Sequence, residues 1–159
     1  MIRKVTHEDI PVCVDIIKRS FLTVAEEFGF TESNAPRFTA FATTAERLFG
    51  QLDSEHRPMY VYEDNGTLYG YYSLSVQQKS CELSNLSVLP GYRHKGIGSL
   101  LFDHAESIAR ELGCDTMDIG IVEENTVLRR WYESKGAVHT GTKKFDFFPF
   151  TCGYMKKEL

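Results

Sequence analysis

The most informative segment of the chain is Leu86–Leu101, which reads LSVLPGYRHKGIGSLL. It predicts a strand, then a basic turn with glycines, then an amphipathic helix. The free N–H groups at the start of such a helix favour an anion, and Gly96 and Gly98 let that anion approach the backbone closely. The basic run 93–95 lies in a chain whose net charge is −4. This local reversal of charge suits a polyphosphate ligand.

The spacing within this segment excludes two common phosphate-binding motifs. A P-loop requires Gly-Lys-Ser/Thr, whereas Gly98 is followed by Ser99 and Leu100. A dinucleotide-binding fingerprint requires a third small residue at the position of Leu101. Taken alone, the two glycines are equally compatible with a basic surface turn that caps a helix and binds nothing.

Hydrophobic periodicity outside this segment predicts alternating strands and helices. Short turns between the central strands favour antiparallel pairing, and a later strand–helix–strand step favours one parallel pair. The expected class is therefore α/β, a mixed sheet with helices on its faces. The expected strands are 2–5, 59–63, 68–76, 81–89, 116–122, 137–145 and 148–156, and the expected helices are one capped by Thr6 with apolar positions to Phe21, then 43–52, 98–112 and 125–135, with a loop at 29–36.

Composition limits the class of protein. With 159 residues, 42% of them hydrophobic and 25% charged, the chain is expected to form a single domain, 1–159. Its net charge of −4 argues against nucleic acid and anionic membranes as partners. No apolar run reaches the roughly 18 residues that a membrane span needs, and the charged N-terminus does not resemble a signal peptide. We therefore expect a cytoplasmic protein. Four scattered cysteines without a CxxC pair predict no metal site.

The chain resembles the GNAT N-acetyltransferases, which move an acetyl group from acetyl-CoA to an amine. Arg93–Gly98 matches their Gln/Arg-x-x-Gly-x-Gly/Ala motif, after an aliphatic–x–Val–x–Pro strand end at Leu86–Pro90. A second motif, Asn followed by Tyr-x-x-x-Gly, is matched by Asn125, Tyr132 and Gly136. Ala after that last glycine departs from the usual Phe, and the first 58 residues match no subfamily. The resemblance implies a mixed, mostly antiparallel sheet of about seven strands, about four helices on both faces, and splayed strands that form a CoA slot.

The resemblance also implies how acetyl-CoA, the expected co-substrate, would be held. The turn would bind the CoA pyrophosphate through backbone N–H groups, and the preceding strand would pair with the pantetheine arm. A backbone N–H near Val88 would donate to the acetyl carbonyl. Asn125 would contact the pantetheine arm, cap its own helix, or do both. The expected cofactor-binding residues are Leu86, Ser87, Val88, Arg93, His94, Lys95, Gly96, Ile97, Gly98, Ser99 and Asn125.

Two residues are expected to move protons. Tyr132 would protonate the departing CoA thiolate, since a phenol with a pKa of about 10 is protonated at neutral pH; its alternative role is simple aromatic packing. Glu82 would act as the general base through water. It lies six residues before Val88, so the two share a strand face if no bulge intervenes. The alternatives are an exposed strand carboxylate and a chain of water molecules.

The expected function is therefore an N-acetyltransferase that uses acetyl-CoA and no metal, with direct attack by a primary amine in a ternary complex. Two alternatives stay open: a CoA-binding sensor without turnover, and an acyltransferase that uses a longer acyl-CoA. The acceptor is open too, as a small molecule or a protein amine. The aromatic run 145–150 is compatible with a homodimer interface or with burial in the chain's own core.

Overall fold

The computed structural model describes residues 1–159. Seven strands form one sheet in the order β1-β2-β3-β4-β5-β7-β6, in which only β4 and β5 are parallel neighbours. None of the helices combines the length and the apolar character that crossing a bilayer requires. The strands are β1 (Ile2–Lys4), β2 (Met59–Asp64), β3 (Thr67–Gln77), β4 (Ser80–Val88), β5 (Thr116–Val122), β6 (Val138–Lys144) and β7 (Thr151–Glu158). The α-helices are α1 (Ile10–Phe28), α2 (Thr39–Ala42), α3 (Ala45–Asp53), α4 (Ile97–Glu111) and α5 (Thr126–Ser134), with 3₁₀ turns η1 (His7–Asp9) and η2 (Pro90–Tyr92).

The mixed, mostly antiparallel sheet predicted from the sequence is confirmed, with three local differences. Helix α1 continues to Phe28 and ends where Gly29 adopts a left-handed conformation at φ 75°. The short helix α2 lies beyond the predicted loop and was not expected, because four residues carry too little periodicity to indicate a helix. Strand β7 begins at Thr151, since Phe148 and Phe150 before it pack into an aromatic cluster.

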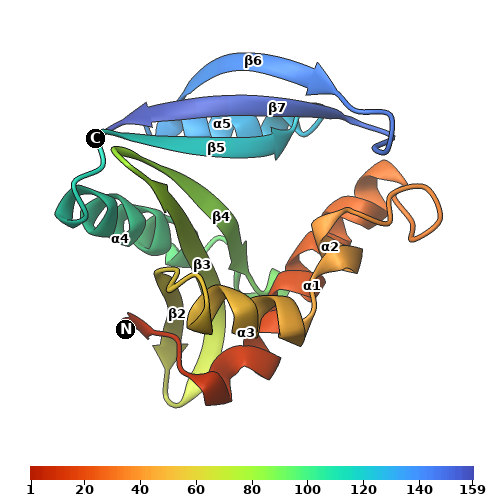
Figure 1. The fold of residues 1–159 in the computed structure, drawn as a ribbon. Coiled ribbons are helices and arrows are strands. Elements are labelled where there is room, and N and C mark those ends of the chain that lie inside the picture. Colours follow the sequence, from red (N-terminus) through yellow and green to blue (C-terminus); the bar gives the residue numbers. More distant parts are fainter.

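Helices cover both faces of the sheet, and the sheet itself opens at one end (Figure 1). Helices α1 and α3 pack on one face, over a core that includes Ile17, Leu48 and Tyr71. Helix α4 packs on the other face against β3 and β4, and its core continues to Tyr132 of α5. Figure 1 shows β2–β4 and β5–β7 as two groups of strands that meet at one end and diverge toward the other.

A separate aromatic cluster lies between α1 and the end of β5. Phe30 is 4.8 Å from Phe150 and 5.1 Å from Phe38 between ring centroids. Val122, the last residue of β5, belongs to the same cluster. The cluster therefore joins the N-terminal helices to the second group of strands. The cluster also includes Phe150, so this residue of the run 145–150 is buried within the chain's own core.

The close approach of α4 to β3 depends on Gly70. A Cβ atom there would lie 2.7 Å from Cδ1 of Leu101 and 3.1 Å from the carbonyl oxygen of Ser87. Both distances are shorter than ordinary contacts, so a side chain at position 70 would force the Leu101 side chain or the β4 backbone to move. Gly70 thereby determines how deeply the first turns of α4 sit beside the end of β4.

Candidate acetyl-CoA site

Strands β4 and β5 separate at a β-bulge. They pair only between Ser80–Leu83 and Thr116–Ile119, although both strands continue beyond those residues. Opposite β3, the register of β4 shifts by one residue, and Asn85 adopts a left-handed conformation at φ 55°. Such a bulge bends and twists the strand that carries it. The carboxyl-terminal half of β4 therefore faces an open gap instead of a neighbouring strand.

Val88 presents its backbone polar groups to that gap. Leu89 donates its N–H to the Tyr69 carbonyl at 2.9 Å, so Leu89 is a hydrogen-bonded position of the β3–β4 ladder. Bonding alternates along an antiparallel pair, so Val88, which is paired with Gly70, directs its N–H and C=O away from β3. The expectation of an N–H donor near Val88 agrees with this geometry.

The turn after β4 forms a row of unpaired N–H donors. None of the backbone N–H groups from His94 to Ser99 donates to another group of the chain. Left-handed conformations at His94 (φ 63°) and Gly96 (φ 85°) shape the turn, and α4 begins at Ile97. The positive end of the helix dipole adds to the attraction for an anion. This arrangement fits the pyrophosphate group that the resemblance implies.

The two glycines of the motif do different things. Gly96 is needed for its conformation, because residues other than glycine are strained at φ 85°. At Gly98, a Cβ atom would lie 3.6 Å from the nearest atom of the Trp131 ring, which is an ordinary contact. The fold therefore does not demand glycine at 98. Its absent side chain leaves the donors open to a ligand.

The three basic side chains of the turn do not act alike. His94 and Lys95 are exposed and free to face an anion. Arg93 instead turns inward to α1, where it donates to the Ser20 carbonyl at 2.9 Å and to Oγ1 of Thr23 at 3.0 Å. Its burial lowers the pKa of the guanidinium. Arg93 therefore contributes charge near the turn, but its donors are used within the chain.

Asn125 caps α5. Its Oδ1 accepts the N–H of Leu128 at 3.3 Å, and its side-chain NH₂ has no partner in the chain. Of the two expected roles, capping is present. The unused NH₂ leaves the second role available.

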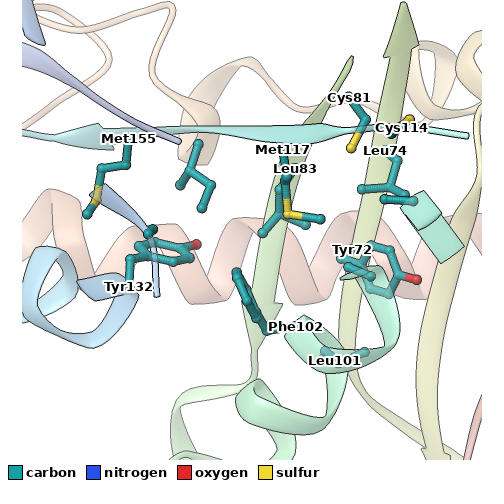
Figure 2. Close-up of a cluster of buried hydrophobic side chains, with 14 of the residues drawn as sticks. Tyr72, Leu74, Cys81, Leu83, Leu101, Phe102, Cys114, Met117, Tyr132 and Met155 are labelled. Carbon is teal, nitrogen blue, oxygen red and sulfur yellow. The ribbon is translucent and has the colours of Figure 1, made fainter. Parts of the chain in front are cut away.

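Tyr132 lies in the core with Phe102 (Figure 2), and its ring also packs edge-on against Trp131. It is 6% exposed, and burial alone raises the pKa of its phenol above the ordinary value. The hydroxyl has no hydrogen-bond partner within the chain, although a buried phenol usually finds one. Figure 2 shows the ring of Tyr132 among the side chains of this cluster. The Tyr132 hydroxyl is thus free to donate a hydrogen bond to a group outside the chain.

Glu82 lies on the other face of the sheet, and the expectation that it shares a face with Val88 is wrong. Cys81 and Leu83 are buried in the core with Tyr132, and Leu86 and Val88 pack against the same core. The bulge at Asn85 adds one residue to β4 and so reverses the alternation. Glu82 is exposed on the opposite face, where it helps raise the pKa of Tyr154 after burial and Cys152. Glu82 thus lies in the segment of β4 that is paired with β5, opposite Asp118, and Tyr132 lies beneath the other face of the sheet.

Two residues that shape the site were not predicted. Ser20 is a hydroxyl within the apolar stripe of α1, and Gly70 is a glycine inside a strand. Each is an exception to its local pattern, and such exceptions signal a special contact. No group of three or more His, Cys, Asp or Glu side chains is placed to hold a metal ion.

An α/β fold with a split sheet and a donor-rich turn defines a class of CoA-dependent transferases, and the comparisons with known proteins identify the family. The sequence model of the Acetyltransferase (GNAT) family matches residues 22–137. The chain therefore belongs to the GNAT family and is an acetyltransferase, with acetyl-CoA as its co-substrate.

Individual relatives are distant. An uncharacterized N-acetyltransferase in the pepI 3′ region of Lactobacillus delbrueckii subsp. lactis is 24% identical over 145 residues, covering 84% of this chain and 81% of its own. A PaiA N-acetyltransferase from Thermoplasma acidophilum, solved with coenzyme A, superposes with a TM-score of 0.81 at 22% identity, over 100% of this chain and 98% of its own. The YncA protein of Salmonella typhimurium, a putative acetyltransferase solved with acetyl-CoA, gives a TM-score of 0.80 at 22% identity, over 100% and 93%. These similarities support the fold and leave the acceptor open.

Proposed function

We propose that the protein, acting as a single domain over residues 1–159, transfers an acetyl group from acetyl-CoA to a primary amine by direct attack in a ternary complex. The observation that carries this proposal is the row of unpaired N–H groups from His94 to Ser99, placed directly after a strand whose edge is open. The row suits the pyrophosphate, and the open edge at Leu86–Val88 suits the pantetheine amides. His94 and Lys95 add charge from the surface.

The backbone of Val88 would stabilise the reacting carbonyl. Its N–H faces the gap and is free of the β3 ladder, as an oxyanion donor must be. Charge develops on the acetyl oxygen as the amine attacks, and a fixed donor there needs no reorganisation. In other enzymes the loss of one such donor costs about 2.7–4 kcal/mol.

Glu82 and Tyr132 would handle the two protons from opposite faces. The new N–C bond forms as the C–S bond breaks. The amine passes one proton to Glu82, directly or through water, and Tyr132 gives its phenolic proton to the departing sulfur. Two observations support this division: the Glu82 carboxylate is exposed, where an amine can reach it, and the Tyr132 phenol is buried.

The acceptor is a primary amine whose carrier is not specified by the site. Relatives carry names that refer to the alanine of ribosomal protein bS18 and to streptothricin. A protein N-terminus and a small amine are thus both represented among similar chains.

Thermal unfolding in the presence of CoA, acetyl-CoA and a longer acyl-CoA, followed by a thiol-release assay with a panel of amines, tests this proposal. A ligand at about 100 times its Kd should add about 2.7 kcal/mol of stability. A shift with acetyl-CoA together with thiol release supports the proposal. A shift without thiol release from any amine favours a sensor, and a larger shift and faster turnover with the longer acyl-CoA would reassign the donor. No shift with any of the three would overturn the site.

A further inference from the structure

The end of β4 is held by a hydroxyl from α1. Ser20 is 5% exposed and lies in the apolar stripe that packs α1 on the sheet. Its Oγ donates to the Val88 carbonyl at 2.9 Å, across 68 residues of sequence. A hydroxyl in such a stripe is unfavourable unless it is bonded, so this contact accounts for its presence.

Arg93 completes the same contact from the other side. Its Nη2 donates to Oγ of Ser20 at 3.1 Å, and its Nε approaches the Val88 carbonyl at 3.4 Å. Thr23 accepts from Nη1 and itself donates to the Ser20 carbonyl at 2.8 Å. All of these acceptors are neutral, and no carboxylate lies within ion-pair distance of Arg93. The group therefore joins α1, the end of β4 and the phosphate-binding turn into one unit without neutralising the charge of Arg93.

The consequence for Val88 follows from what the strands lack. Where β4 leaves β5, both the N–H and the C=O of Val88 lose the partner that a neighbouring strand would supply. Ser20 and Arg93 satisfy the carbonyl, and nothing satisfies the N–H. At the open edge of β4, Val88 therefore offers only its N–H for a hydrogen bond. A ligand group that binds there must accept a hydrogen bond.

We propose that Ser20 is a positioning residue for acetyl transfer: with Arg93 it occupies the Val88 carbonyl and fixes the direction of the Val88 N–H toward the acetyl oxygen. This inference rests on the proposed function, because it assigns the Val88 donor to the acetyl group. It makes α1 part of the reaction geometry even though Ser20 touches neither substrate.

Ser20→Ala tests the contact, with Ser20→Thr as the rescue that keeps the hydroxyl. Thr43→Val is the matched control, because Thr43 is 3% exposed and also donates one buried side-chain hydrogen bond, at 2.7 Å to a helix carbonyl, away from β4. The measurements are kcat and KM for acetyl-CoA, the Kd values of CoA and acetyl-CoA, and Tm. If Ser20→Ala does not fold, Arg93→Lys tests the same contact, since it retains the charge and loses the forked donor geometry.

The expected result separates positioning from simple destabilisation. Ser20→Ala should lower kcat roughly 3- to 10-fold, the range for one lost hydrogen bond, while the Kd of CoA changes less than about twofold because the turn keeps its free N–H groups. Because the Val88 N–H would bind the acetyl oxygen, we expect the wild type to bind acetyl-CoA more tightly than CoA, and Ser20→Ala should remove most of that difference. Ser20→Thr should restore both values, and Thr43→Val should lower Tm with kcat unchanged.

Two outcomes would overturn the inference. One is a Ser20→Ala variant with the kcat and the acetyl-CoA preference of the wild type. The other is an equal loss of CoA and acetyl-CoA affinity, which a loosened fold alone would produce. If the wild type binds both ligands and transfers no acetyl group, the proposed function fails instead, and the ratio of the two Kd values still decides the role of Ser20.

Discussion

Replacing Tyr132 by Phe should raise stability and lower turnover at the same time. Tyr132 is 6% exposed and its hydroxyl makes no hydrogen bond within the chain, so its removal takes away a largely but not fully buried polar group without breaking a bond. Burial of such a group costs about 1–3 kcal/mol by mutational measures. Because the hydroxyl borders the gap, we expect a gain near the lower end, about 1 kcal/mol, or roughly 2–4 °C in Tm for a chain of this size.

The effect on catalysis should have the opposite sign. General acid catalysis contributes roughly 10²- to 10⁴-fold, so kcat for thiol release should fall by about that factor, which is about 2.7–5.4 kcal/mol of activation free energy. The Kd of acetyl-CoA should stay within about twofold, since the donors of the turn are backbone N–H groups that the substitution does not remove. Thiol release under saturating substrates, isothermal titration with acetyl-CoA and thermal unfolding measure the three quantities.

Tyr72→Phe is the matched control from the same core (Figure 2). Tyr72 is 0% exposed, but its hydroxyl is hydrogen-bonded to Nδ1 of His104 at 2.7 Å. Its removal leaves the histidine unpaired, so stability should fall by about 1–2 kcal/mol with kcat unchanged. A Tyr132→Phe enzyme that is less stable and fully active would refute the reasoning, because it would show that the phenol only packs.

Three further predictions concern the fold and the second proton. Gly70→Ala should destabilise the chain by about 1–3 kcal/mol and weaken CoA binding, because the new methyl group crowds Leu101 and the Ser87 carbonyl of β4. Gly50→Ala, with no atom within 4 Å of its Cβ, should be neutral or stabilising; denaturant unfolding measures both variants. Glu82→Gln should lower kcat at neutral pH by about 10²-fold or more and recover as the pH rises toward the amine pKa of about 10.4; Asp118→Asn, at the neighbouring register position, should leave the pH–rate profile unchanged. The Arg3 guanidinium, which pairs with Asp9, lowers the pKa of the Asp9 carboxyl to about 2. A depressed pKa means that the stabilisation is present above about pH 4 and is lost as the pH falls toward 2, so Asp9→Asn should be about 1–2 kcal/mol less stable than the wild type at pH 7, with the difference vanishing near pH 2 in acid unfolding.

Local features of the sequence were sufficient to predict the glycine-containing turn between β4 and α4. A strand end, a left-handed glycine and the start of a helix all depend on residues within one short segment, so Gly96 and the N–H groups after it could be predicted. Strand alternation and helical periodicity likewise placed most elements, because each depends on neighbours a few positions away. The length of α1 and the helix α2 were missed where that periodicity weakens.

Counting along a strand failed at Glu82. The bulge at Asn85 inserts one residue into β4, and the alternation of side chains along a strand does not reveal such an insertion in the sequence. The motif includes Arg93 among the expected cofactor-binding residues, but the Arg93 side chain turns to Ser20 of α1, 73 residues away in sequence. Only the folded chain brings the two together.

Sequence alone was therefore enough to indicate the family, the acetyl-CoA turn and the residue types that could move protons. Tertiary structure decided that β4 separates from β5, that Tyr132 is buried without a partner, and that Glu82 lies on the opposite face. It also brought Ser20 to the Val88 carbonyl. The physical reason is that neighbouring residues set the backbone conformation and the start of a helix. The burial of a side chain, the face of the sheet on which it lies and the hydrogen-bond partner of the Val88 carbonyl depend on segments that meet only after folding.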